Sequence, residues 1–205
     1  MCDYSRIMNK TTRSLSQILE VKTGFPLREA AKHDAQGDAL IVQMKDVDPL
    51  AGVSWETPIT IKTKGRNEPD WLREDDILFV GRGSRFFAVH VSAPPKPSVA
   101  SPHFYVLRAG SRQKINPHFL VWLLNGKQAQ KFYAEHIEGS ALPYISRKTL
   151  AMLPVDLPDV QTQARIVQAY KCWKKERRLL EELIEQKEAL IDGLLEQRIH
   201  QGVAA

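Results

Sequence analysis

The stretch ISRKTLAMLPVDLP, residues 145–158, determines how the chain is organised. Ser146 can cap a short helix through its hydroxyl, whereas Pro154 and Pro158 lack the N–H that a helix interior needs and hold the chain extended. A helical spacing of apolar residues begins after Pro158. The stretch therefore predicts the junction between a compact domain and a long helical arm.

Composition narrows the class of protein. The chain has 205 residues, of which 43% are hydrophobic, enough for one sizeable domain with an extension. Cys2 and Cys172 lie far apart, which excludes a disulfide framework and a zinc-binding spacing. No apolar run approaches the roughly 20 residues that span a bilayer, and the polar start lacks an apolar signal core. We expect a soluble, cytoplasmic protein.

Charge is distributed unevenly along the chain, whose formal net charge is +5. No acidic residue occurs between Asp76 and Glu135. The basic residues of that segment are Arg82, Arg85, Lys96, Arg108, Arg112, Lys114, Lys127 and Lys131. Such segregation indicates a positive surface for a polyanion such as nucleic acid. The alternative is a solvated basic stretch that acids from elsewhere in the chain offset in space.

Short extended runs separated by turn-forming residues predict a mainly antiparallel sheet in an α+β domain. These runs are residues 39–42, 59–61, 77–80, 86–89 and 104–107. Residues 81–85 fit a hairpin loop, and the Pro-rich residues 93–97 fit a surface connection.

Helix signals lie on both sides of this region. A short helix is expected from Ser14, because apolar positions follow at helical spacing until Gly24 and Pro26. Asn116 followed by proline predicts a second helix that runs to about Glu135, with Trp122 in the core. The predicted organisation is a leader (1–12), a compact domain (13–158), a helical arm (159–200) and a tail (201–205).

The arm carries an apolar seam on alternating four- and three-residue spacings, as in a coiled coil. The seam residues are Ile166, Tyr170, Trp173, Leu180, Ile184, Ile191 and Leu194. Further leucines at positions 179, 183, 190 and 195 widen the stripe, which suggests more than one partner surface. We expect the arm to dimerise and to dock another subunit.

The order of motifs resembles the DNA-specificity subunits of type I restriction-modification enzymes. LSQILEVKTGFP (15–26) is similar to the family's opening pattern, VQMKDV (42–47) to one of its strands, and LREDDILFVGRG (72–83) to its "L..GDIL….G" element, with Asp75 where glycine is commoner. Residues 139–167, including 145–158 and QARIV at 163–167, are similar to the end of a target-recognition domain leading into a coiled-coil arm.

The resemblance implies a non-catalytic recognition subunit with one target-recognition domain and one arm, whereas family members usually carry two of each. Two copies joined through antiparallel arms would rebuild the full architecture and read an interrupted palindrome. The implied partners are double-stranded DNA, an adenine methyltransferase subunit with S-adenosylmethionine as its cofactor, and an optional endonuclease-translocase. No cofactor is expected in this chain.

The DNA-reading candidates are loop residues with donors that can reach phosphates or base edges. They are Lys45, Lys62, Lys64, Arg66, Arg82, Arg85, Ser140, Tyr144, Arg147 and Lys148. Each of the basic residues could instead be a solvated surface charge, and Tyr144 could be a core aromatic.

Catalytic motifs are missing from the sequence. It has no Asn/Asp-Pro-Pro-aromatic tetrad for adenine methylation, no Gly-rich cofactor loop after a strand and no Walker-type loop. Residues 20–22 and 185–187 match the acidic-x-Lys element of metal-dependent nucleases, but the first is expected at the end of a helix and the second in the arm. Two alternatives to a specificity subunit stay open: a small metal-dependent nuclease that uses one of these elements, and an orphan or decoy DNA-binding module.

Overall fold

The computed structural model describes residues 12–27, 30–63, 68–110 and 114–203. The chain divides into two compact units, residues 1–164 and 165–205. The first turn of the long C-terminal helix therefore belongs to the first unit. No helix in the described ranges is long and apolar enough to cross a membrane.

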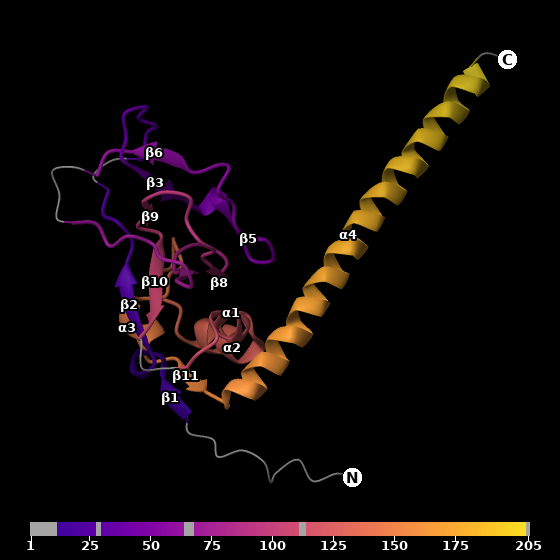
Figure 1. The fold of residues 1–205 in the computed structure, drawn as a ribbon. Coiled ribbons are helices and arrows are strands. Elements are labelled where there is room, and N and C mark those ends of the chain that lie inside the picture. The colour runs from indigo at the N-terminus through magenta and orange to yellow at the C-terminus, as the bar shows by residue number, and fades with distance from the viewer. Residues whose placement is uncertain (1–11, 28–29, 64–67, 111–113, 204–205) are drawn as a thin grey trace, which may run out of the picture. The chain divides into compact units, whose positions relative to one another are not determined.

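A four-stranded antiparallel sheet forms the centre of the first unit (Figure 1). Its order is β2 (Leu19–Thr23), β10 (Phe104–Ala109), β7 (Ile77–Val80) and β8 (Phe87–His90). Every residue of β7 is buried, because the strand lies between two neighbours and both of its faces are covered. This explains its continuous apolar run, ILFV, in place of an alternating pattern.

Three smaller sheets complete the strands. β6 (Ile59–Ile61), β3 (Ala39–Val42) and β9 (Ser98–Ala100) form one sheet, in which β3 and β9 are parallel. β4 (Val47–Asp48) pairs with β5 (Gly52–Val53), and β1 (Thr12–Ser14) pairs with β11 (Pro154–Asp156). The β6–β3–β9 sheet and the β1–β11 pair lie at opposite ends of the unit (Figure 1).

Short helices cover the central sheet. The 3-10 turns η2 (Leu15–Gln17) and η3 (Met44–Asp46) precede strands, and α1 (Pro117–Asn125) packs against β8. α2 (Lys127–Glu135) follows α1 directly, and its Tyr133 is buried in the main apolar cluster. The Asn116 side chain accepts a hydrogen bond from the His118 N–H at 2.9 Å, which caps α1 as the sequence predicts.

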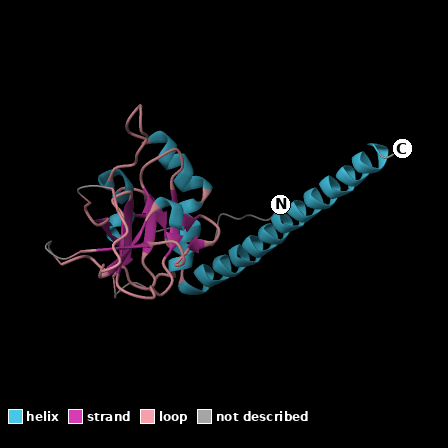
Figure 2. Ribbon diagram, turned by 90° about the horizontal axis from the view of Figure 1, so that it is seen from above, coloured by secondary structure: helices cyan, strands magenta, loops and turns pink. Residues whose placement is uncertain are grey.

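The junction stretch has the predicted form. The Ser146 hydroxyl accepts a hydrogen bond from the Thr149 N–H at 3.2 Å and caps α3 (Arg147–Ala151). Pro154 then begins the extended β11, and α4 (Val160–Val203) is one unbroken helix of 44 residues (Figure 2). Thr12, expected at the end of the leader, is instead the first residue of β1.

The predicted strands 39–42, 59–61 and 77–80 are confirmed, as is the α+β class, whereas the strands predicted at 86–89 and 104–107 form at 87–90 and 104–109. The helix expected from Ser14 is wrong, because only one 3-10 turn forms before the chain enters β2 and pairs with β10. The single helix expected up to Glu135 is divided at Gly126, whose backbone is extended. Trp122 is 37% exposed and packs against Phe119 on one side, so its predicted core position is also wrong.

Candidate nucleic-acid interface

Two loops that are distant in sequence are joined by backbone hydrogen bonds. In the β7–β8 hairpin loop, the Gly83 N–H donates a hydrogen bond to the Pro143 carbonyl, and the Gly81 carbonyl accepts one from the Ile145 N–H. Both bonds are 2.9 Å long. Arg82 and Tyr144 are bridge partners between these bonds. The hairpin and the segment before α3 therefore form one surface.

The segment before α3 is itself a closed loop. Glu138 and Tyr144 exchange two backbone hydrogen bonds of 2.9 Å, which enclose residues 139–143. α3 starts three residues after Tyr144, so its first turn lies beside the loop. We call the resulting set of predicted residues the loop cluster: Arg82, Arg85, Ser140, Tyr144, Arg147 and Lys148.

Donors of the loop cluster face solvent. Tyr144 is half-buried and the other five residues are exposed. Among the described residues, none of the four basic side chains of the cluster forms an ion pair. Their charges are thus available to an anion.

The one acid within this surface is held by hydroxyl groups. The Thr149 hydroxyl donates to the Glu138 carboxylate at 3.0 Å. Hydrogen bonds from Ser146 and Thr149 lower the pKa of Glu138, so the carboxylate stays ionised. The Glu138 carboxylate therefore keeps its negative charge on this surface and is fixed to the start of α3.

Tyr105 supports the cluster from below. Burial raises the pKa of its hydroxyl against the attraction of the neighbouring Arg82. The ring fills the space beside Gly81, where a Cβ atom would lie 2.5 Å from a ring carbon. Glycine at this position therefore lets the hairpin backbone approach the Tyr105 ring closely.

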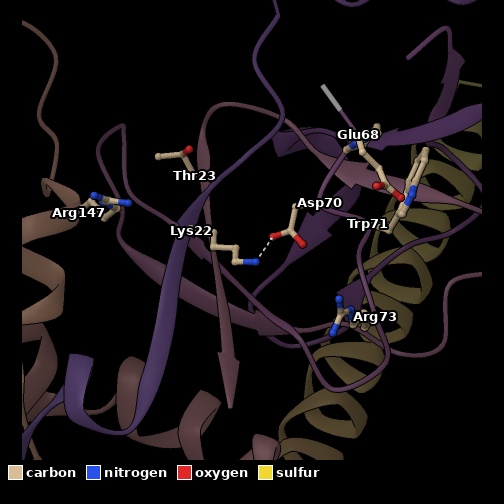
Figure 3. Close-up of a pocket in the computed structure, with 8 residues that line it drawn as sticks. Lys22, Thr23, Glu68, Asp70, Trp71, Arg73 and Arg147 are labelled. Atoms are coloured by element: carbon tan, nitrogen blue, oxygen red, sulfur yellow. Dashed lines mark ion pairs between the residues drawn. The ribbon is translucent and has the colours of Figure 1, made fainter. Parts of the chain in front are cut away.

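A cleft of about 580 Å³ adjoins the cluster at Arg147 (Figure 3). Its lining is Lys22, Thr23, Glu68, Pro69, Asp70, Trp71, Arg73 and Arg147. Of these, only Arg147 is among the sequence candidates. Lys22 and Arg73 belong to the motifs at 15–26 and 72–83, which the sequence analysis singled out. Neither motif indicated that the two residues line the same cleft.

Arg108 is an internal cation and not part of the positive surface. Its guanidinium donates to both oxygens of Asp76 at 2.7 Å and to Asp70 at 2.8 Å. Hydrogen bonding to Asp76, which outweighs burial, raises the pKa of Arg108. The acid-free segment therefore contributes fewer surface charges than its sequence suggests, because one of them is neutralised by the carboxylates just before it.

The other candidates lie elsewhere. Lys45 is exposed on η3, and Lys62, which follows β6, pairs with Asp34 at 3.3 Å. β3 and β6 lie at the opposite end of the domain from α3 (Figure 1). Lys62 directly follows β6, so it is not brought to the loop cluster. Lys64 and Arg66 lie outside the described residues.

The acidic-x-Lys element at 20–22 is on β2, and its expected place at the end of a helix is wrong. The Lys22 Nζ atom lies 3.4 Å from a carboxylate oxygen of Glu20 and 3.1 Å from one of Asp70. Burial acts to raise the pKa of Asp70, but hydrogen bonds from Arg108 and Lys22 outweigh it and lower that pKa. No group of three or more potential metal ligands occurs in the described part of the chain.

The predicted seam of α4 is largely uncovered. Trp173, Leu180, Ile184, Ile191 and Leu194 are 46–55% exposed, and Ile166 and Tyr170 are half-buried. Leu179, Leu183, Leu190 and Leu195 are exposed beside them.

Comparison with solved structures shows a shared fold. The chain is similar to the S subunit of a type I restriction-modification system from M. genitalium, with 14% identity and a TM-score of 0.55 over 90% of this chain and 44% of that one. It is also similar to the HsdS subunit from Thermoanaerobacter tengcongensis, with 16% identity and a TM-score of 0.62 over 89% of this chain and 47% of that one. A third structure, from a study of complex assembly in the type I R-M system, gives 16% identity and a TM-score of 0.65 over 87% and 45%.

The chain thus spans less than half the length of these structures. No curated protein matches it. Residues 8–187 match the family described as the type I restriction modification DNA specificity domain. This match covers most of the chain, which therefore belongs to that family of non-catalytic DNA-recognition domains.

Proposed function

We propose that this chain reads double-stranded DNA through the loop cluster and directs an adenine methyltransferase to a specific site. The observation that carries this proposal is the backbone pairing of residues 81–83 with 143–145, which gathers Arg82, Arg147 and Lys148 on one exposed surface. Basic side chains supply phosphate contacts, and Ser140 and Tyr144 add donors and acceptors that can reach base edges.

The cleft extends this surface toward Arg73. Arg73 and Arg147 both line it, and neither has an ion-pair partner among the described residues. Lys22 is less available, because Asp70 and Glu20 already lie within 3.4 Å of its ammonium group. We assign Arg73 to the phosphate contacts and Lys22 to the support of the cleft wall.

The quaternary part of the proposal is a homodimeric half-subunit. The exposed stripe of α4 supports it, because a long helix with leucines at 46–63% exposure gains stability by packing against another helix. A twofold dimer would place two loop clusters on one duplex, so the target would have two matching halves and a spacer set by the arms.

The proposed partners supply the chemistry. An adenine methyltransferase subunit would bring S-adenosylmethionine and transfer the methyl group, and an endonuclease-translocase could join the same complex. This chain would supply site choice alone.

Two experiments test the proposal. Selection from a pool of random duplexes with the purified chain should enrich a two-part site with matching halves. Mapping methylated adenines in cells that carry only this chain and its methyltransferase should return the same site. An asymmetric site would mean that the chain pairs with a different half-subunit and does not form a homodimer. Methylation that persists without this chain would refute the specificity role.

A second candidate is a metal-dependent nuclease, favoured by the proximity of Asp70 to the Glu20-x-Lys22 element on β2. Against it, Asp70 is compensated by both Lys22 and Arg108, which leaves little negative charge for a divalent cation. Incubating supercoiled DNA with the chain and Mg²⁺ or Mn²⁺ separates the two functions. Cleavage that is lost in Glu20→Gln would establish the nuclease.

A third candidate, an orphan or decoy module, shares the DNA-binding surface but not the enzyme partner. Co-purification of the chain with a methyltransferase, tested in the same cells, distinguishes it from the main proposal.

A further inference from the structure

Leu142 is the most exposed large apolar side chain among the described residues of the recognition domain, at 59%. It stands in the loop enclosed by Glu138 and Tyr144, between Ser140 and Tyr144 of the loop cluster. Leucine side chains gain free energy from burial, and more than half of this one is exposed in the isolated chain.

The loop holds Leu142 outward. The reciprocal Glu138–Tyr144 hydrogen bonds close the loop, and the Gly83 N–H fastens the Pro143 carbonyl to the hairpin. Gly139 adopts φ +79°, and a Cβ atom there would lie 2.7 Å from the Leu142 carbonyl oxygen. The backbone is folded too tightly for Leu142 to withdraw toward the core without loss of these bonds.

The surroundings of Leu142 favour a polyanion over an apolar protein surface. Arg82 is the bridge partner of Tyr144, two residues along from Leu142, and Arg147 and Lys148 follow in α3. An apolar protein groove would have to desolvate these exposed cations, whereas the phosphates on either side of a DNA groove would pair with them.

We propose that Leu142 is an apolar wedge that enters a base step when the loop cluster docks on DNA. This inference rests on the proposed function and adds a residue role to it. Apolar side chains inserted between base pairs partly unstack them and kink the duplex, and the larger protein surface that the bent duplex touches offsets the unstacking cost. Flexible pyrimidine–purine steps deform most readily, so Leu142 would contribute specificity without a hydrogen bond to a base.

The test uses the full-length chain and a duplex carrying the selected site, with 2-aminopurine placed at successive positions. The fluorescence of this base analogue rises when it is unstacked. We expect a rise at one step in each half-site with the parent protein and with Leu142→Met, which keeps an apolar side chain of similar volume. Leu142→Ala should lose the rise and part of its preference for target over random duplex, while binding random duplex as the parent does.

Ile137→Ala is the matched control, because Ile137 is also exposed, at 47%, but precedes the closed loop. It should retain the rise. Thermal unfolding of each variant checks that the loop change leaves the domain folded.

The outcomes separate this inference from the function on which it rests. Target binding by the parent without a fluorescence rise, or a rise that survives in Leu142→Ala, overturns the wedge and leaves DNA recognition intact. Failure of the parent to bind any duplex overturns both. Normal unstacking by Leu142→Ala together with loss of the methyltransferase would assign Leu142 to a protein interface instead.

Discussion

The recognition domain and the arm differ in how much of their apolar surface they cover by themselves. In the domain, all four residues of β7 are buried and the charge of Arg108 is matched by Asp70 and Asp76. In α4, Leu190 is 63% exposed and Leu194 is 53% exposed. Since burying one leucine contributes about 1.5–3 kcal/mol, the arm leaves a substantial stabilisation unrealised in the isolated chain. The domain therefore buries its apolar surface by its own folding, whereas the arm would need a partner helix to bury its exposed leucines.

The strongest effect is expected in the arm. Leu180→Glu or Ile184→Glu would bury an unpaired carboxylate in the proposed seam, and twofold symmetry would place two such charges in each dimer. An uncompensated buried charge costs about 3–5 kcal/mol, so each variant should sediment as a monomer.

Ala189→Glu is the control for the arm, because position 189 is exposed and lies on the opposite face of the helix. It should dimerise like the parent. Dimers of unchanged affinity in both seam variants would remove the seam assignment.

The next effect disrupts the domain from within. Arg108→Met would leave Asp76, which is 1% exposed, without its bidentate partner. We expect a loss of about 3–5 kcal/mol in the free energy of unfolding by urea. Arg73→Met removes an exposed arginine nearby and should change stability by only about 0.5 kcal/mol or less. Equal stability of the two variants would mean that the buried pair is dispensable.

Much of the domain could be predicted from local sequence, because continuous or alternating apolar runs bounded by turn residues have few alternatives to strands. Residues 77–80 and 104–107 are examples. The region from Ser14 to Val21 was predicted wrongly because its apolar spacing also fits a 3-10 turn followed by a strand. Pairing of β2 with the distant β10 decided between the two, and no local pattern encodes that pairing.

The site shows the same division. The positions of Arg82 and Arg147 beside turns were predictable, since glycine, proline and capping signals mark those turns. Their proximity was not, because it depends on hydrogen bonds between residues 81–83 and 143–145. Counting charges also failed at Arg108, since charge in sequence does not distinguish a surface cation from one buried against carboxylates.

A smaller effect refines the assignment of the loop cluster. Arg82→Ala or Arg85→Ala should weaken target binding by about 1–3 kcal/mol and relax preference at one position in each half-site if a base edge is read. A phosphate contact would instead weaken all sequences alike and reduce the salt slope. Lys62→Ala, at the other end of the domain, is the control. Titration against target and random duplex at several salt concentrations distinguishes these outcomes, and parental behaviour of both arginine variants would remove the hairpin from the interface.

Acid should weaken the domain through Asp70, whose pKa is lowered because hydrogen bonds from Arg108 and Lys22 outweigh the effect of burial. A lowered folded-state pKa adds stability above the unfolded-state value, about 4, and that stability is lost as the pH falls through the folded-state value. Urea unfolding between pH 6 and about pH 3 should therefore show a shallower acid loss in Asp70→Asn than in the parent. If the stability of the two proteins falls with pH at the same slope, the contacts of Asp70 with Arg108 and Lys22 do not contribute to the acid response.

The weakest effect concerns Asp75, which stands where the family pattern favours glycine and adopts φ +68°. The left-handed region costs a residue with a Cβ atom about 1–2 kcal/mol, although aspartate tolerates it better than most. The His90 Nε2 atom lies 2.9 Å from an Asp75 carboxylate oxygen and so supplies a local reason for aspartate at this turn. Asp75→Ala loses that contact and keeps the strain, whereas Asp75→Gly loses the contact and relieves it. Urea unfolding should therefore rank Asp75→Ala below Asp75→Gly by about 1 kcal/mol, with the glycine variant close to the parent. Equal stability of the two variants in both the parent and a His90→Ala background would show that the turn relaxes without glycine. Equal stability in the parent background alone would assign the effect to the contact with His90 rather than to the backbone.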